Sequence, residues 1–224
     1  MIITVDGPSG SGKGTICQLL AGQLGFHLLD SGALYRLTAL ALERAGLGLS
    51  NESQVADLAR ELDVVFTVVD KQARVILQGD DVTLAIRQES IGMLASNVAA
   101  MPPVRAALLE RQRAFAEAPG LVADGRDMGT TIFPEAAVKV FLTASAEERA
   151  KRRYLQLQGK GENPDMNIIL ADIQARDERD CSRSASPLVA AKDALKIDSS
   201  SLSIEAVLKQ VLDKVDDYRQ SVSG

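Results

Sequence analysis

The sequence predicts an α/β protein in which a five-stranded parallel sheet carries helices on both faces, giving three layers. The first observation behind this prediction is that short apolar runs alternate with segments of helical spacing. The second is that the polar motifs follow the ends of these runs, where ligands gather in a parallel sheet. The third is the length of 224 residues, which suits one substantial core with inserted pieces. The five predicted strands are Ile2–Val5, Phe26–Asp30, Leu121–Asp124, Val138–Leu142 and Ala194–Asp198.

Helical spacing and turn residues define the segments between these strands. A β-branched run at 64–69, a second run at 74–77 and a short piece near Val82 are separated by tight turns, which predicts a small antiparallel insert. A polar loop with two glycines occupies 159–164. The first predicted helix begins at Lys13 and stops at Gly25, and another begins after a cap at Ser50 or Asn51. Further helices are predicted at about 32–45, 84–99, 104–116, 146–157 and 166–179. A closing helix carries the apolar residues Ile204, Val207, Leu208, Val211, Leu212 and Val215.

Composition excludes several classes of protein. The hydrophobic fraction of 46% and the charged fraction of 25% are ordinary for a globular chain. The net charge of -5 argues against a nucleic-acid partner. No apolar stretch approaches the roughly 20 residues of a membrane span, and Met1 leads straight into a strand, so we expect a cytoplasmic protein. The absence of a heptad seam favours a monomer. With His27 as the one histidine, and Cys17 and Cys181 far apart, a zinc site or a Ser-His-Asp hydrolase is excluded.

The first loop carries the clearest motif of the chain. Residues 7–15 read GPSGSGKGT, so Gly7 to Lys13 fit the spacing G-x-x-x-x-G-K between a strand and a helix. Glycines let backbone N–H groups converge on phosphates, the helix N-terminus adds positive charge, and the lysine reaches the transferable phosphate. The pattern departs from the strict form because Gly14 stands where Ser or Thr is usual, with Thr15 one position later. The sequence predicts a nucleoside triphosphate here; the alternative is a glycine-rich turn without a ligand.

A second stretch, Leu29–Arg36, follows the end of the second predicted strand. Ser31 offers a hydroxyl at a helix start, and Tyr35 and Arg36 lie one turn further on. A guanidinium and two hydroxyls can hold a second phosphate. Taken alone, the stretch is equally compatible with a helix cap, a packed tyrosine and a solvated arginine.

A third stretch, Ala123–Thr130, follows the third predicted strand. Asp124 ends that strand as a magnesium-side carboxylate does in P-loop proteins. Arg126 suits a phosphate, whereas Asp127 needs a hydrogen-bond donor, such as the exocyclic amine N4 of cytosine. The alternative is a surface turn held by an Arg–Asp pair.

Together these motifs resemble the cytidylate kinase family, in the bacterial type that phosphorylates CMP and dCMP, among the P-loop nucleoside monophosphate kinases. The resemblance covers nearly the whole chain, and its second and third motifs are specific. It implies a P-loop NTPase fold with an antiparallel insert and a helical lid. The matching stretches are GPSGSGKGT at 7–15, LDSGALYR at 29–36, the Val104–Arg105 step, DGRDMGT at 124–130, ERAKRR at 148–153 and RDERDCSR at 176–183.

The resemblance assigns roles to individual residues. It implies that Lys13, Arg126, Arg153 and Arg183 are catalytic. The ATP-binding residues would be Gly7, Pro8, Ser9, Gly10, Ser11, Gly12, Lys13, Gly14, Thr15, Arg152 and Arg153. The residues that would hold the CMP phosphate are Ser31, Tyr35, Arg36, Arg126 and Arg183. Ser96, Arg105 and Asp127 would bind the edge of the cytosine, and Arg176 and Asp180 would face the sugar. Thr15 and Asp124 would hold Mg²⁺, directly or through water. Without the resemblance, the helical face shared by Arg149, Arg152 and Arg153 would be interpreted as a solvated charged surface.

The resemblance also divides the chain and defines its reaction. It implies a core domain at 1–30, 84–149 and 177–224, a CMP-binding region at 31–83 with its insert at about 63–83, and a lid at 150–176. The expected reaction is transfer of the ATP γ-phosphoryl group to CMP or dCMP. Alternatives are a P-loop kinase for UMP or a small metabolite, and a non-enzymatic nucleotide switch. A switch would be expected to carry a guanine-specific N-K-x-D signature, which the sequence lacks.

Overall fold

The computed structural model describes residues 1–69 and 72–223. The chain forms two compact units. The first unit comprises Met1–Asp30 and Arg113–Gly224, and the second comprises Ser31–Gln112.

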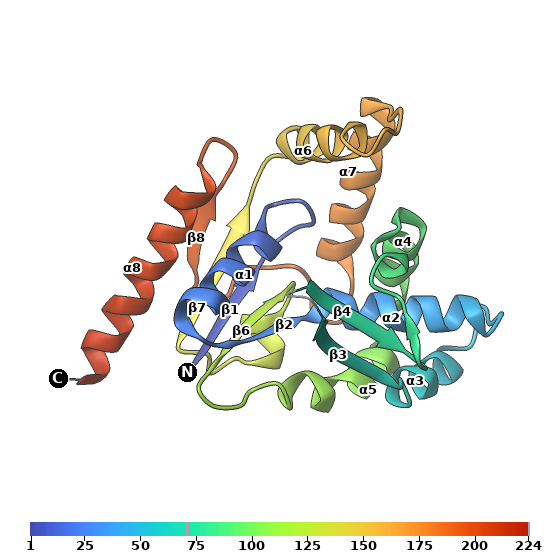
Figure 1. The fold of residues 1–224 in the computed structure, drawn as a ribbon, viewed down its shortest axis with the longest axis horizontal. Coiled ribbons are helices and arrows are strands. Elements are labelled where there is room, and N and C mark those ends of the chain that lie inside the picture. Colours follow the sequence, from blue (N-terminus) through green and yellow to red (C-terminus); the bar gives the residue numbers. More distant parts are fainter. Residues whose placement is uncertain (70–71, 224) are drawn as a thin grey trace. The chain divides into compact units, whose positions relative to one another are not determined.

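The first unit is built on a five-stranded sheet in the order β2-β6-β1-β7-β8, in which every neighbouring pair is parallel (Figure 1). The predicted parallel sheet is therefore confirmed. Asp6, the last residue of the central strand, pairs with Gly125 on one side and Phe141 on the other, so the loops after these strands begin at one edge of the sheet. The strands are β1 (Ile2–Asp6), β2 (His27–Asp30), β6 (Leu121–Gly125), β7 (Val138–Thr143) and β8 (Leu195–Asp198).

Two helices of the first unit pack against this sheet. Apolar side chains of α1 (Lys13–Leu24) and α8 (Ile204–Ser223) form one buried cluster with inward-facing residues of β1, β6, β7 and β8. Continuous β-branched strands and a helix with a valine stripe bury this surface together, as expected for a parallel sheet. The remaining elements of this unit are α6 (Ala146–Gln158), α7 (Met166–Ser182) and a turn of π-helix, η2 (Met128–Ile132).

The second unit contains helices and a three-stranded antiparallel sheet in the order β3-β4-β5, which confirms the predicted insert. Asn51, one of the two predicted caps, accepts a hydrogen bond from the backbone of Gln54 at the start of α3. The elements are α2 (Ser31–Arg44), α3 (Glu52–Arg60), β3 (Val64–Val69), β4 (Gln72–Leu77), β5 (Asp80–Asp81), η1 (Ala85–Arg87), α4 (Glu89–Val98) and α5 (Pro102–Arg113), whose last residue opens the second segment of the first unit.

The helix expected over 84–99 is interrupted, which corrects the prediction. Gln88 has extended backbone and separates η1 from α4. The guanidinium of Arg36 donates to the carbonyl oxygen of Ile86 in η1 at 2.8 Å and to that of Gln88 at 3.3 Å, which also accepts from the backbone N–H of Gly92 in α4. Periodicity alone does not reveal this break, because the apolar spacing continues through it.

None of the helices in residues 1–69 and 72–223 combines the length and the apolar character that crossing a membrane requires.

Replacement of Leu20 by alanine tests the core between α1 and the sheet. Leu20 is fully buried, whereas the adjacent Leu19 is 39% exposed. Leu20→Ala should lower the free energy of unfolding by about 2–5 kcal/mol, because it removes buried methyl groups and leaves a cavity. The matched Leu19→Ala variant should change it by less than about 1 kcal/mol. Chemical denaturation measures both values, and equal losses would contradict this packing.

Candidate functional site

The loop between β1 and α1 is fixed by its backbone. Gly7 has φ +149°, and a Cβ there would lie 1.9 Å from the carbonyl oxygen of Leu142, so only glycine fits. Further along the loop, the hydroxyl of Ser11 and the ammonium of Lys13 both donate to the carbonyl oxygen of Pro8, at 3.0 Å and 2.7 Å. Gly12 has φ +96° and ends the loop as the N-cap of α1. The strand, loop and helix of the phosphate-binding motif thus occupy the predicted positions.

Lys13 is the central charge of this loop, and its side chain is only 5% exposed. Burial, and then the positive charge of Arg126, lower the pKa of Lys13 to about 8, while the carboxylates of Asp124 and Asp6 act in the opposite direction. Burial raises the pKa of Asp124, and the positive charge of Lys13 acts in the opposite direction. These opposing effects describe an ammonium and two carboxylates that share a poorly solvated region at the edge of the sheet.

Asp124 also lies beside the start of α1. A Cβ at Gly14 would lie 3.6 Å from Oδ2 of Asp124, which is ordinary van der Waals contact. Gly14 is the position where the strict motif has Ser or Thr, and the exposed Thr15 follows it. The carboxylate and the first turn of the helix are therefore adjacent, as expected for two groups on the metal side of a triphosphate.

Arg149 on α6 ties the phosphate-binding loop to α7, a role that the sequence did not reveal. Its guanidinium donates to the carbonyl oxygens of Ala144 at 2.9 Å and Ser9 at 3.1 Å, and it forms a two-point ion pair with Asp177. Arg149 is buried, so its part of the helical face is no solvated surface. The spacing of three residues from Arg149 to Arg152 was the available signal, but spacing does not tell which arginine turns inward.

The two neighbouring arginines of α6 make weaker or more exposed contacts. Arg152 donates to the carbonyl oxygen of Ser199 at 2.6 Å and forms an ion pair with Glu148. The hydroxyl of Ser199 in turn donates to the carbonyl oxygen of Ser11 at 3.0 Å, which connects Arg152 to the phosphate-binding loop. Arg153 donates to Gln156 on its own helix.

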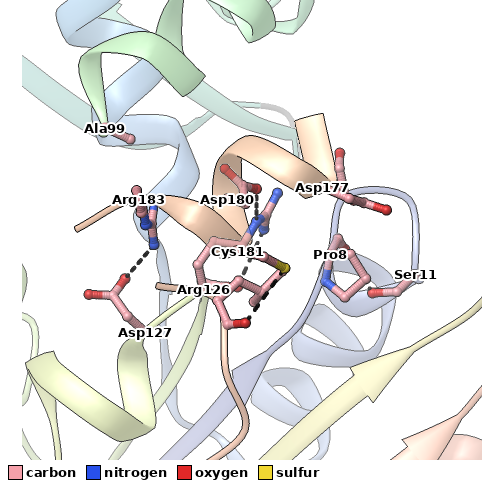
Figure 2. Close-up of polar contacts among 12 residues, drawn as sticks. Pro8, Ser11, Ala99, Arg126, Asp127, Asp177, Asp180, Cys181 and Arg183 are labelled. Atoms are coloured by element: carbon pink, nitrogen blue, oxygen red, sulfur yellow. Dashed lines mark hydrogen bonds and ion pairs between the residues drawn. The ribbon is translucent and has the colours of Figure 1, made fainter. Parts of the chain in front are cut away.

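The loop after β6 and the end of α7 bring two arginines and two carboxylates together (Figure 2). Nε of Arg126 lies 3.0 Å from Oδ2 of Asp180, and NH2 of Arg183 lies 3.8 Å from Oδ1 of Asp127. Burial alone would raise the pKa of Asp180, but the charge of Arg126, its hydrogen bond and the charges of Arg176 and Arg183 lower the pKa below its ordinary value. The helix runs to Ser182, beyond the predicted end near 179, and this extra turn carries Asp180.

In the second unit, three of the predicted residues are held in defined contacts. The hydroxyl of Ser31 donates to Oε1 of the fully buried Gln112 at 2.7 Å, a partner that the sequence did not single out. The guanidinium of Arg105 lies 5.6 Å from the centre of the Tyr35 ring and donates to the carbonyl oxygen of Ala99. Tyr35 and Arg105 are both buried, so neither is a solvated surface group.

Ser96 belongs to α4, and the guanidinium of Arg36, a residue of α2, lies against the same helix. A Cβ at Gly92 would meet the guanidinium of Arg36 at 2.8 Å, so the glycine allows the arginine to lie against this helix. Ser96, one turn further along α4, is buried, and its hydroxyl has no hydrogen-bond partner among the residues that the structure describes. A buried hydroxyl without a partner is costly unless a ligand completes it.

Binding of the triphosphate should be accompanied by proton uptake at Lys13. With a pKa of about 8, Lys13 is roughly three-quarters neutral at pH 8.5 in the nucleotide-free chain, whereas the phosphates favour its charged form. Isothermal titration with MgATP at pH 8.5, in buffers of different ionisation enthalpy, should therefore report a net uptake of protons. Lys13→Met should abolish this uptake. A wild-type binding heat that is the same in every buffer would contradict the assignment.

Comparison with known proteins covers nearly the whole chain. The family model for cytidylate kinase matches residues 3–217. A cytidylate kinase of Stutzerimonas stutzeri (strain A1501) is 58% identical over 218 residues, which is 96% of this chain and 95% of that protein. Cytidylate kinases of Pseudomonas syringae pv. tomato (strain ATCC BAA-871 / DC3000) and Pseudomonas fluorescens (strain Pf0-1) are 59% and 58% identical, each over 216 residues, 96% of this chain and 94% of that protein. With matches of this extent, the chain belongs to the cytidylate kinase family.

Proposed function

We propose that this chain transfers the γ-phosphoryl group of ATP to the phosphate of CMP or dCMP, giving ADP and CDP or dCDP. As a member of its family the chain is an ATP-dependent phosphotransferase. The observation that carries the proposal at the level of residues is that one unit holds both the phosphate-binding loop with Lys13 and the arginines Arg126 and Arg183 beside buried carboxylates. A triphosphate loop accompanied by two further guanidinium groups suits a reaction between two phosphates.

The reaction needs positioning and charge stabilisation more than proton transfer. The acceptor oxygen belongs to a phosphate that is already largely ionised at neutral pH, so a strong general base is not required. Lys13, Arg126, Arg153 and Arg183 would stabilise the charge that spreads over the transferred group. The backbone N–H groups of the Gly7–Thr15 loop would cradle the triphosphate.

We propose Mg²⁺ as the metal of this site, held by Asp124 and Thr15 directly or through water. The residues present fit the ion, because the Asp124 carboxylate lies beside the first turn of α1, and Mg²⁺ in kinases takes one or two carboxylates together with substrate phosphates. Residues 1–69 and 72–223 contain no group of three or more His, Cys, Asp or Glu residues suited to a metal ion. When bound with ATP, the ion would neutralise charge on the phosphates.

We propose roles in binding the acceptor for residues of each unit. Asp127, only 2% exposed, would accept from the exocyclic amine of cytosine, and the unpartnered hydroxyl of Ser96 and the guanidinium of Arg105 would meet other atoms of the base edge. UMP presents a carbonyl where CMP presents that amine, so a carboxylate disfavours it. The phosphate would be held by Ser31, Tyr35, Arg36, Arg126 and Arg183, and the sugar by Arg176 and Asp180.

Several finer features remain predictions. We propose that residues 150–176 act as a lid that keeps water from the γ-phosphate, because α6 contacts the phosphate-binding loop through Arg149 and Arg152. The predicted monomer, the cytoplasmic location and the division into core, CMP-binding region and lid also stay predictions.

The test is ADP release from MgATP with CMP, dCMP, UMP, AMP and GMP as separate acceptors. CMP and dCMP should be the preferred acceptors, and Asp127→Asn should reduce the preference for CMP over UMP by about 10- to 100-fold, because one carboxylate–amine pair is lost. Asp193→Asn is the matched control, since this carboxylate pairs with Lys139 at an exposed position.

Two results would overturn parts of the proposal. Turnover that favours another acceptor would retain the kinase but reject the base-reading residues. Turnover that does not depend on any acceptor would favour a nucleotide switch instead.

A further inference from the structure

The carboxylate of Asp6 holds the backbone that follows Asp127. Asp6 ends β1 and is only 4% exposed. Its Oδ1 accepts from the backbone N–H of Met128 and its Oδ2 from the backbone N–H of Gly129, each at 2.8 Å. Each oxygen thus accepts from one of two consecutive N–H groups, so the carboxylate holds one peptide segment at two points.

The pairing of the strands explains how this contact arises. Asp6 lies opposite Gly125 in the β1–β6 ladder, only two residues before Asp127. The chain then enters η2, in which the N–H groups of Thr131 and Ile132 donate to the carbonyl oxygen of Asp127 at 2.9 Å and 3.2 Å. A wide turn of this kind leaves its first N–H groups without partners inside the turn. Asp6 supplies those partners from a neighbouring strand.

This arrangement changes what the side chain of Asp127 can do. An aspartate at the residue before a helical turn ordinarily accepts an N–H from that turn. Asp127 occupies this position but makes no such capping bond, and its carboxylate instead lies 3.8 Å from Arg183. Because Asp6 performs the capping, the carboxylate of Asp127 is directed away from its own turn.

We propose that Asp6 is a positioning residue that aims Asp127 and thereby sets the preference for a base with an exocyclic amine. The inference rests on the proposed function, in which Asp127 reads that amine. Asp6 acts through the backbone N–H groups of Met128 and Gly129. Its loss should therefore change the choice of acceptor base, read from the ratio of kcat/KM for CMP over UMP, in which any effect on Lys13 and ATP is common to both acceptors.

Asp6→Asn is the most direct variant, because it keeps the size of the side chain and removes one of the two acceptors. The amide NH₂ would face a backbone N–H, so one donor would lose its partner and the turn would move. Thr4→Val is the matched control. Thr4 lies two residues earlier on β1 and is fully buried, and a Cβ at Gly129 would lie 2.8 Å from its Oγ1. That Oγ1 has no hydrogen-bond partner among the described residues. Thr4→Val therefore replaces a hydroxyl by a methyl group next to the same turn without removing a hydrogen bond.

The experiment measures kcat and KM for CMP, UMP and ATP in the wild-type chain and in Asp6→Asn, Thr4→Val and Asp127→Asn, together with each thermal midpoint. Asp6→Asn should lower the ratio of kcat/KM for CMP over UMP by at least about tenfold, toward the ratio of Asp127→Asn, mainly through a higher KM for CMP. Thr4→Val should keep the wild-type ratio.

The outcomes separate the inference from its premise. A wild-type ratio in Asp6→Asn, with a lowered thermal midpoint, would mean that Asp6 only supports the fold, and would overturn the inference while Asp127→Asn still shifts the ratio. A wild-type ratio in Asp127→Asn would overturn the proposed role of Asp127 and the inference with it. If Asp6→Asn does not fold, Asp6→Glu decides, because its carboxylate is one methylene longer and must displace the turn; an unchanged ratio there would reject the inference.

Discussion

The constraint on which the rest of this structure depends is a buried ammonium at the carboxyl end of the central strand. The ammonium of Lys13 is buried at the start of α1 and loses its contacts with water. The hydrogen bond to the carbonyl oxygen of Pro8 and the negative charges of Asp124 and Asp6 stabilise it there. Burial also disfavours the charged form of the carboxylates, and it raises the pKa of Asp6 to about 6. The parallel register of β1 and β6 makes this arrangement possible, because it delivers Asp6 and Asp124 to the same edge of the sheet as the glycine loop.

On the proposed function, anion binding in this acidic protein depends on arginines that carboxylates already hold in place. The net charge of -5 provides no general attraction for nucleotides, so positive charge must be concentrated locally. Arg126 is held by Asp180, Arg149 by Asp177, and the carboxylate of Asp127 lies beside Arg183. Such pairs contribute modestly to stability, but they fix guanidinium groups before a phosphate arrives, which is what a transfer between two phosphates requires.

Much of this fold and part of its site follow from sequence, for identifiable reasons. The five strands, the glycine loop and the antiparallel insert are local patterns of side-chain type, and they are confirmed. The break at Gln88 does not follow from the sequence, because the apolar spacing continues through it. Arg149 was placed on a solvated face in the absence of a resemblance, and Asp6 was passed over, because both act through backbone groups of segments that only the folded sheet brings near. Ser96 and Arg105 were found through the family resemblance alone, and their roles stay predictions.

The measurement that tests the central claim most directly is the turnover of MgATP with CMP by Lys13→Met, beside a Lys209→Met control on the exposed face of α8. If the buried ammonium stabilises the transferred phosphoryl group, Lys13→Met should lose about 10² to 10³ in kcat, because removing one charged donor at the transition state costs roughly 3–4 kcal/mol. Circular dichroism checks that each variant is folded, and Lys209→Met should turn over at the wild-type rate. A Lys13→Met variant that is folded and within tenfold of the wild-type kcat would contradict the account.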